Sequence, residues 1–207
     1  MNTGADEATP HAPARGQGPA PGDPGGLVLV AGIGNLFLRD DGFGPEVVRR
    51  LADPPGLPPE ARVVDYGIRG MHLAYDLLAG YAALVLVDAC PGEGPPGTVT
   101  VLEVGPDDLG EGEFDAHGMN PVAVLANLGQ LGGTLPPAFV VGCVPADLGE
   151  GIGLSAAVAA AVPEAAEAVR ALLGRIRQGD APPGAGRVCP PPSAPAARSA
   201  ASEPRRA

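Results

Sequence analysis

Residues 27–44 read LVLVAGIGNLFLRDDGFG, and they give the clearest indication of the fold. It opens with a continuous apolar run over 27–31, which is too short for a helix and therefore predicts a strand buried on both faces. Two glycines turn the chain, and the adjacent carboxylates Asp40 and Asp41 follow. Pro45 suits the first position of a helix. The carboxylates should thus lie near the carboxyl end of a buried strand, where open α/β sheets place their sites.

The two glycines do not predict a dinucleotide cofactor. The dinucleotide fingerprint needs a third glycine so that the helix packs closely, and the corresponding position, counted from Gly32, is Phe37. The two acidic residues that follow would repel a phosphate, and the sequence contains no GxxxxGK[ST] motif. We therefore expect no cofactor-binding residues in this stretch.

The run GIGNLFLRDDGFG resembles the opening motif of the hydrogenase maturation proteases, the endopeptidases that trim the large subunit of nickel–iron hydrogenases. Their pattern is roughly G-x-G-N-x-x-x-x-D-[DE]-x-x-G. The matching positions are Gly32, Gly34, Asn35, Asp40, Asp41 and Gly44. A match of this length that includes an acidic pair is far more specific than a bare glycine motif. The resemblance implies an α/β fold, a three-layer α/β/α sandwich around a mostly parallel five-stranded sheet.

Composition restricts the partners of the chain. A net charge of −11 argues against nucleic acids and anionic membranes, because both need a positive surface. No segment reaches the ~18 apolar residues of a membrane span, and the N-terminus has no basic-then-apolar signal peptide. The three cysteines form neither a CxxC pair nor an even set, so no disulfide framework or thiolate metal site is indicated. We expect a cytoplasmic monomer without nucleic-acid or membrane partners.

The two ends of the chain differ from its middle. Residues 1–25 are rich in Pro, Gly and Ala, and from residue 179 the composition returns to Pro, Ala and Arg. Such segments cannot bury enough apolar surface to offset the entropy of ordering. We therefore expect disordered tails over 1–25 and 179–207 and a single domain over 26–178.

Strand and helix patterns alternate through this middle region. Further strands are predicted over 61–65, 82–87, 98–104 and 138–144, and the mixed pattern of 98–104 suggests a sheet edge. Helices are predicted over 70–79 and 121–131, over a short segment capped by Ser155, and over a longer one from Pro163 to about Arg177. This alternation predicts a largely parallel sheet with helices on both faces.

Three aspartates, Asp41, Asp65 and Asp88, follow strands that are expected to be buried. In a parallel sheet such positions share one rim, and His117 arrives from a later loop. Two carboxylates and an imidazole suit Ni²⁺, Zn²⁺ or a similar divalent ion with coordination positions left open. In the resembled family, the metal-contacting residues are the second acid of the opening motif, an Asp ending the central strand and a His in a later loop. The resemblance therefore assigns the catalytic and metal-contacting roles to Asp41, Asp88 and His117.

Each of these residues also has an interpretation without function. Asp41 can be an acid favoured at a helix N-terminus, Asp88 can end a loop, and an isolated histidine such as His117 more often lies in a surface loop. Asp65 matches an Asp in the family's D-G-G-T-x-G-like segment, which here reads DYGIRG. We expect Asp40 to turn away from Asp41, since neighbouring carboxylates cannot easily share one site.

The resemblance implies an aspartic-type or metal-dependent endopeptidase that removes a C-terminal extension from a nickel–iron hydrogenase large-subunit precursor after nickel insertion. The nickel then belongs to the substrate. Two other classes remain open: a module that binds nickel or docks the precursor without cutting it, and a small-molecule α/β hydrolase that shares only the fold. The presence of all three ligand positions favours the protease.

Overall fold

The computed structural model describes residues 26–53, 56–105, 125 and 128–179. The predicted tails, apart from Gly179, lie outside the described residues. So do His117 and most of the helix predicted over 121–131.

Five strands form one sheet in the order β2-β1-β3-β5-β4. They are β1 (Val28–Ile33), β2 (Ala61–Gly67), β3 (Ala83–Ala89), β4 (Val99–Val104) and β5 (Ala138–Cys143). The first three and β5 run parallel, whereas β4 pairs antiparallel with β5 at the edge predicted for it. The central strands β1, β3 and β5 are buried along almost their whole length, as their continuous apolar runs predict. The predicted α/β fold with a mostly parallel sheet is confirmed.

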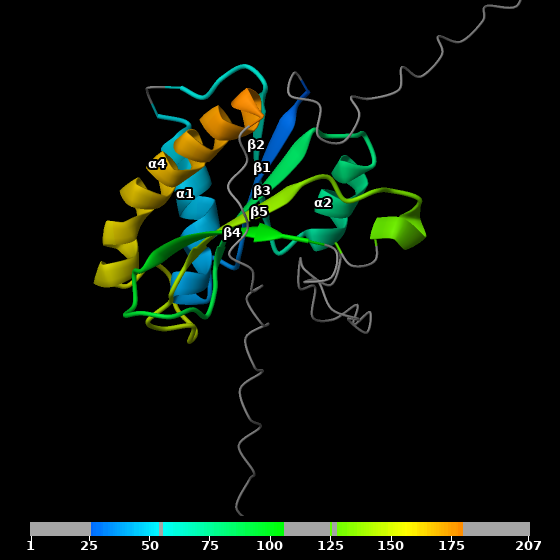
Figure 1. Cartoon of the computed structure of the whole chain (residues 1–207). Helices are drawn as coiled ribbons and strands as arrows, with labels where there is room; N and C mark the ends of the chain where they lie inside the picture. Colours follow the sequence, from blue (N-terminus) through cyan, green and yellow to red (C-terminus); the bar gives the residue numbers. More distant parts are fainter. Residues whose placement is uncertain (1–25, 54–55, 106–124, 126–127, 180–207) are drawn as a thin grey trace, which may run out of the picture.

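Helices cover both faces of this sheet (Figure 1). On one face lie α1 (Phe43–Leu51) and α4 (Ala156–Gln178), which pack against each other, and on the other lies α2 (Gly70–Leu77). Each interface has its own apolar core. Phe43, Val47 and Leu172 belong to the first core, and Leu73 and Leu77 belong to the second. The molecule is therefore a three-layer α/β/α sandwich. Within the described residues, no helix combines the length and hydropathy needed to cross a bilayer.

Three helix predictions differ from the structure. Pro163 does not open a second helix, because α4 runs unbroken through it. Pro163 itself is exposed, while Ala161, Val162 and their neighbours on the opposite side are buried. Burial of that side outweighs the hydrogen bond that proline removes, a cost of about 3 kcal/mol. The helix α1 begins at Phe43, ahead of Pro45, and the residues Leu128–Leu131 form a 3-10 helix, η3, where α-helix was predicted.

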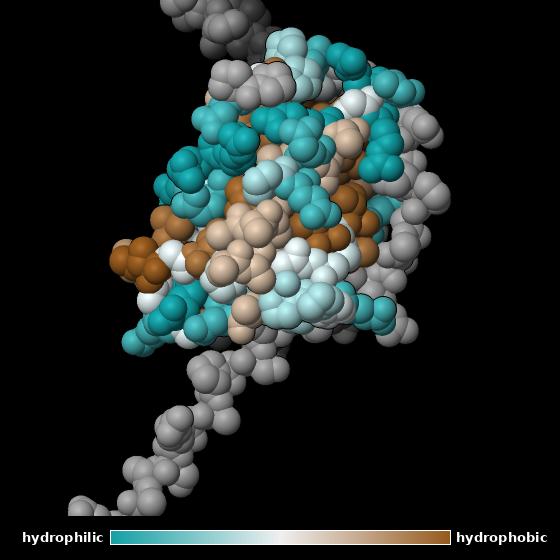
Figure 2. Space-filling view, turned by 90° about the vertical axis from the view of Figure 1, so that its left-hand side faces the viewer, coloured by the Kyte–Doolittle hydropathy of each residue, from teal (hydrophilic) through white to brown (hydrophobic). Residues whose placement is uncertain are grey.

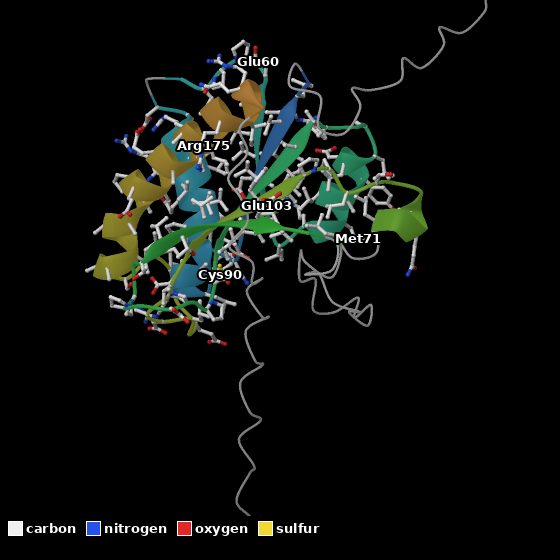
Figure 3. All side chains as sticks on the ribbon, in the orientation of Figure 1. Glu60, Met71, Cys90, Glu103 and Arg175 are labelled. Carbon is white, nitrogen blue, oxygen red and sulfur yellow. The ribbon has the colours of Figure 1, made fainter. Side chains whose placement is uncertain are left out.

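The order of the strands reverses between β1 and β3, because the chain moves from β1 to β2 and then crosses back to β3. Such a switch point is where open α/β sheets bind ligands, outside the carboxyl ends of the strands. A Cβ on Gly44 would collide with the carbonyl oxygens of Ile33 and Val87, so only glycine lets α1 start this close to both strands. In Figure 3, Cys90 directly follows β3 and marks this end of the sheet, whereas Glu60 directly precedes β2 and marks the other.

Candidate active site

Asp41 lies in a short 3-10 helix, η1 (Arg39–Gly42), between β1 and α1. Its Oδ2 accepts a hydrogen bond of 2.6 Å from the backbone N–H of Asn35. The side chain is half-buried, and this burial raises the pKa of the Asp41 carboxyl, although the Asn35 N–H partly opposes the rise. No other hydrogen bond or ion pair reaches the carboxylate from the described part of the chain. One oxygen is thus anchored, and the other accepts no hydrogen bond from the described residues.

Gly34 allows the chain to pass close to Asp41. Its φ of +133° is a conformation that suits glycine, and a Cβ at this position would collide with the carbonyl oxygen of Asp41. The N–H of Gly34 donates to the carbonyl oxygen of Gly67 at 3.1 Å, which ties the turn after β1 to the end of β2. The second glycine of the motif therefore brings Asp41 and the two strand ends together.

Asp40 turns away from Asp41, as predicted, and is completely buried, with 0% of its surface exposed. Its Oδ2 accepts hydrogen bonds from the backbone N–H groups of Ala146 and Asp147 at 2.8 and 2.9 Å. Its Oδ1 accepts one from the N–H of Ser155 at 2.6 Å. Burial alone would raise the pKa of Asp40, but these bonds outweigh it and hold the pKa below its ordinary value. Asp40 is therefore an ionised anchor between η1 and the loop that joins β5 to α4.

Asp88 is the second-last residue of β3 and is half-buried between two buried neighbours. In the sheet it pairs with Gly142 of β5. The strand β3 contacts η1, the element that carries Asp41. Asp41 and Asp88 therefore lie at the same rim of the sheet, beside the switch point, Asp41 in the segment that follows β1 and Asp88 on β3.

Asp65 also lies at this rim, on β2, where it pairs with Gly32 of β1. It is exposed, and its Oδ1 accepts a hydrogen bond of 2.9 Å from the N–H of Gly67, which stabilises a local turn. It also lines a surface pocket of about 360 Å³ together with Arg69 and His72. This arrangement gives Asp65 a structural role in the turn after β2.

The predicted set of three metal-contacting residues stays a prediction. His117 lies outside the described residues. Among the residues that are described, no three or more His, Cys, Asp or Glu side chains gather in a group that could hold a metal ion. Two members of the predicted set, Asp41 and Asp88, nevertheless lie at one rim.

Two contributions to the site were not predicted from the sequence. Asn35 was matched to the motif without a role, yet its N–H anchors Asp41 and its Oδ1 accepts the N–H of Phe37 at 3.0 Å. An asparagine directly after a glycine turn is a typical signal for such a local bond. The second contribution is the loop between β5 and α4, which binds Asp40. No signal in its own sequence identifies this contact, because the partners lie far apart in the chain.

Comparison with known proteins points to one family. A family model described as hydrogenase maturation protease matches residues 45–172. This match begins just after the opening motif, so it rests on a different part of the chain from the acidic pair. The matched range includes Asp88 and the position of His117.

Individual relatives agree with the family model. The hydrogenase expression/formation protein HupD of Rhodobacter capsulatus is 36% identical over 150 residues, which cover 70% of this chain and 70% of HupD. The hydrogenase 2 maturation protease of Escherichia coli is 31% identical over 151 residues, covering 70% of this chain and 90% of that protein. The solved structure of the hydrogenase maturating endopeptidase HybD from E. coli superposes with a TM-score of 0.61 at 29% identity, covering 74% of this chain and 94% of HybD. The chain shares its fold with HybD, and the family model matches residues outside the opening motif. The chain therefore belongs to the hydrogenase maturation proteases, endopeptidases that act in hydrogenase maturation.

Proposed function

We propose that this chain removes a C-terminal extension from a nickel–iron hydrogenase large-subunit precursor, after nickel has been inserted. The observation that carries the proposal is the position of Asp41 and Asp88 on either side of the β1–β3 switch point. The name of the E. coli relative, a hydrogenase 2 maturation protease, supports a hydrogenase as the substrate.

In this proposal the nickel is part of the substrate. Asp41, Asp88 and His117 contact it from the protease side and place the scissile peptide bond beside it. Two carboxylates and one imidazole include no thiolate, so they bind free nickel weakly. The cysteine ligands of the substrate hold the ion far more tightly. The site therefore detects nickel that has already been inserted.

The chain supplies orientation and a base for the hydrolysis. The N–H of Asn35 fixes one oxygen of Asp41, which orients this carboxylate toward the substrate's nickel. The nickel would polarise the scissile carbonyl; a water oxygen then bonds to the carbonyl carbon while a carboxylate that does not hold the nickel accepts the proton. The C–N bond then breaks, and the proton passes to the leaving amine.

Two parallel assays test where the nickel must reside. In one, enzyme treated with a chelator and then freed of it receives nickel-loaded precursor. In the other, untreated enzyme receives nickel-free precursor, and the large subunit is weighed by mass spectrometry. We expect cleavage in the first assay and none in the second. The reverse result would mean that the enzyme carries its own catalytic ion.

Asp41→Asn is the matched variant for these assays. It keeps the shape of the side chain and can still accept the Asn35 N–H, but it loses the charge. We expect no cleavage, with stability within about 1 kcal/mol of the unsubstituted protein. Asp41→Glu keeps the carboxylate that the motif also permits and should retain activity. A precursor that binds without losing mass would instead identify a docking module, and normal cleavage by Asp41→Asn would refute the role of Asp41.

A further inference from the structure

Three large apolar side chains are exposed on the two loops beside Asp41. Leu36 is 47% exposed and Phe37 is 69% exposed, both between β1 and η1, and Ile152 is 80% exposed between β5 and α4. We call these three residues the rim patch. In the space-filling view, brown and tan residues gather across the middle of the face formed by α1 and α4, while the upper part is mainly teal (Figure 2).

The loops that carry the rim patch are held together by their backbones. The N–H of Gly151 donates to the carbonyl oxygen of Phe37 at 2.9 Å, and the N–H of Arg39 donates to the carbonyl oxygen of Gly151 at 3.1 Å. These bonds form a short parallel bridge between Leu38 and Gly151. Arg39 has a φ of +48°, which is uncommon for a residue other than glycine, and its Nε lies 3.2 Å from Asp147 Oδ2. The patch is thus displayed on a rigid frame.

The rim patch is also connected to Asp41 through a single residue. The backbone N–H of Asn35 binds Asp41 Oδ2 at 2.6 Å, and the side-chain Oδ1 of the same residue accepts the N–H of Phe37 at 3.0 Å. On the other loop, the N–H of Ser155, three residues after Ile152, binds the buried Asp40 at 2.6 Å. Hydrogen bonds therefore link the two loops of the patch to both acidic residues of η1.

We propose that the rim patch docks an apolar segment of the protein substrate next to the bond that is cut. This inference rests on the proposed function and adds a docking contact to it. Apolar side chains on a preorganised frame lose little conformational freedom on binding, and covering them releases water. A few such residues commonly supply most of the affinity of an interface. Three residues are too few for a stable dimer, which buries about 800 Å² on each partner, whereas they suit a short segment of a substrate chain.

The test compares Phe37→Ser and Ile152→Ser with two controls. Leu27→Ser removes an apolar side chain that is similarly exposed (46%) but lies before β1, at the opposite end of the sheet. Phe37→Leu keeps the position apolar. The dissociation constant for the nickel-loaded precursor is measured in the Asp41→Asn background, where no cutting occurs, and KM and kcat are measured with Asp41 intact. We expect each serine variant on the patch to weaken binding and raise KM about tenfold, with kcat unchanged and both controls near normal.

The outcomes separate this inference from the proposed function. If the unsubstituted enzyme cuts the precursor but both patch variants behave like Leu27→Ser, the docking surface is refuted and the protease stands. If the enzyme does not cut but binds, and the patch variants weaken binding, the docking surface stands without the protease. If it neither cuts nor binds, both fail. Thermal unfolding of each variant checks folding, and because the two patch positions lie on different loops, Ile152→Ser still decides the question if Phe37→Ser is unfolded.

Discussion

Asp40 and Asp41 are adjacent in the sequence, yet their surroundings shift their pKa values in opposite directions. Burial raises the pKa of Asp41, which has one backbone N–H, that of Asn35, as its partner among the described residues. Asp40 is more deeply buried, but its backbone hydrogen bonds lower its pKa despite the burial. The number of hydrogen-bond donors thus decides the sign of each pKa shift, and only Asp40 is held as an anchoring carboxylate.

The first stability prediction concerns Asp40→Asn. An amide has one acceptor oxygen, and its NH₂ group would face N–H donors that now bind a carboxylate. Because buried donors would lose their partner, we expect unfolding in urea to show a loss of about 2–4 kcal/mol. Asp53→Asn is the matched control, since Asp53 is exposed and forms a surface ion pair with Arg50. Equal stability of the two variants would contradict the anchoring role.

The same variant should change how stability depends on pH. The folded pKa of Asp40 lies below the ordinary value of 3.8, so between these two values the unfolded state binds more protons and stability rises with pH. The stabilisation is complete above the ordinary pKa and is lost as the pH falls through the folded value. Asp40→Asn should lack this acid loss in urea titrations between about pH 2 and pH 5. The pKa of Asp41 is raised, so its contribution to the pH dependence of stability has the opposite sign. Asp41→Asn should therefore not reproduce the effect.

At the scale of elements, the strands were easier to predict than the helices. The apolar runs of β1, β3 and β5 carry their own signal, because a strand buried on both faces needs no alternation. The length of α4 could not be predicted from local rules, since Pro163 is a helix-start signal locally and is overruled by burial of Ala161, Val162 and their neighbours. Tertiary packing therefore determines the length of α4.

Pro163 therefore supplies an element-scale prediction. It lies on the exposed side of α4 and lacks the N–H that a helix interior uses. Pro163→Ala should restore that hydrogen bond and stabilise the protein by about 1–3 kcal/mol, seen as a higher urea midpoint. Glu164→Ala, one residue further along the same exposed side, should change stability by less than about 0.5 kcal/mol. An unchanged or lower midpoint for Pro163→Ala would indicate that α4 needs the proline where it is.

The part of the candidate site that depends only on where the parallel strands end could be predicted from the sequence. Asp41 and Asp88 were expected at one rim because parallel strands end on the same side, and the structure places them there. The contact between Asp40 and the loop between β5 and α4 could not be predicted in this way. Backbone N–H groups occur at every residue except proline, so a sequence does not reveal which of them a carboxylate will select.

At the scale of the whole molecule, both apolar cores among the described residues lie between Val28 and Ile176. The helix α4 ends at Gly179, whose φ of +71° is the left-handed cap typical of a helix end. We predict that a chain trimmed to 26–179 unfolds cooperatively on heating, with a midpoint close to that of the full chain, because the removed segments have a composition that cannot form a core. Circular dichroism measures both midpoints. Loss of soluble protein on trimming would mean that one of the ends packs on the domain.

Asp40 holds the loop between β5 and α4 through backbone N–H groups. Apart from Asp147, which pairs with Arg39, and Gly151 and Gly153, whose positive φ favours glycine, the side chains on that loop can therefore be exchanged without weakening its attachment to η1, provided that no proline replaces a donor. Selection among substrates can then diverge in the loop while the chemistry beside it stays constant. For protein engineering, this means that grafting residues 148–153 from a relative should transfer its choice of precursor and leave the cutting apparatus intact.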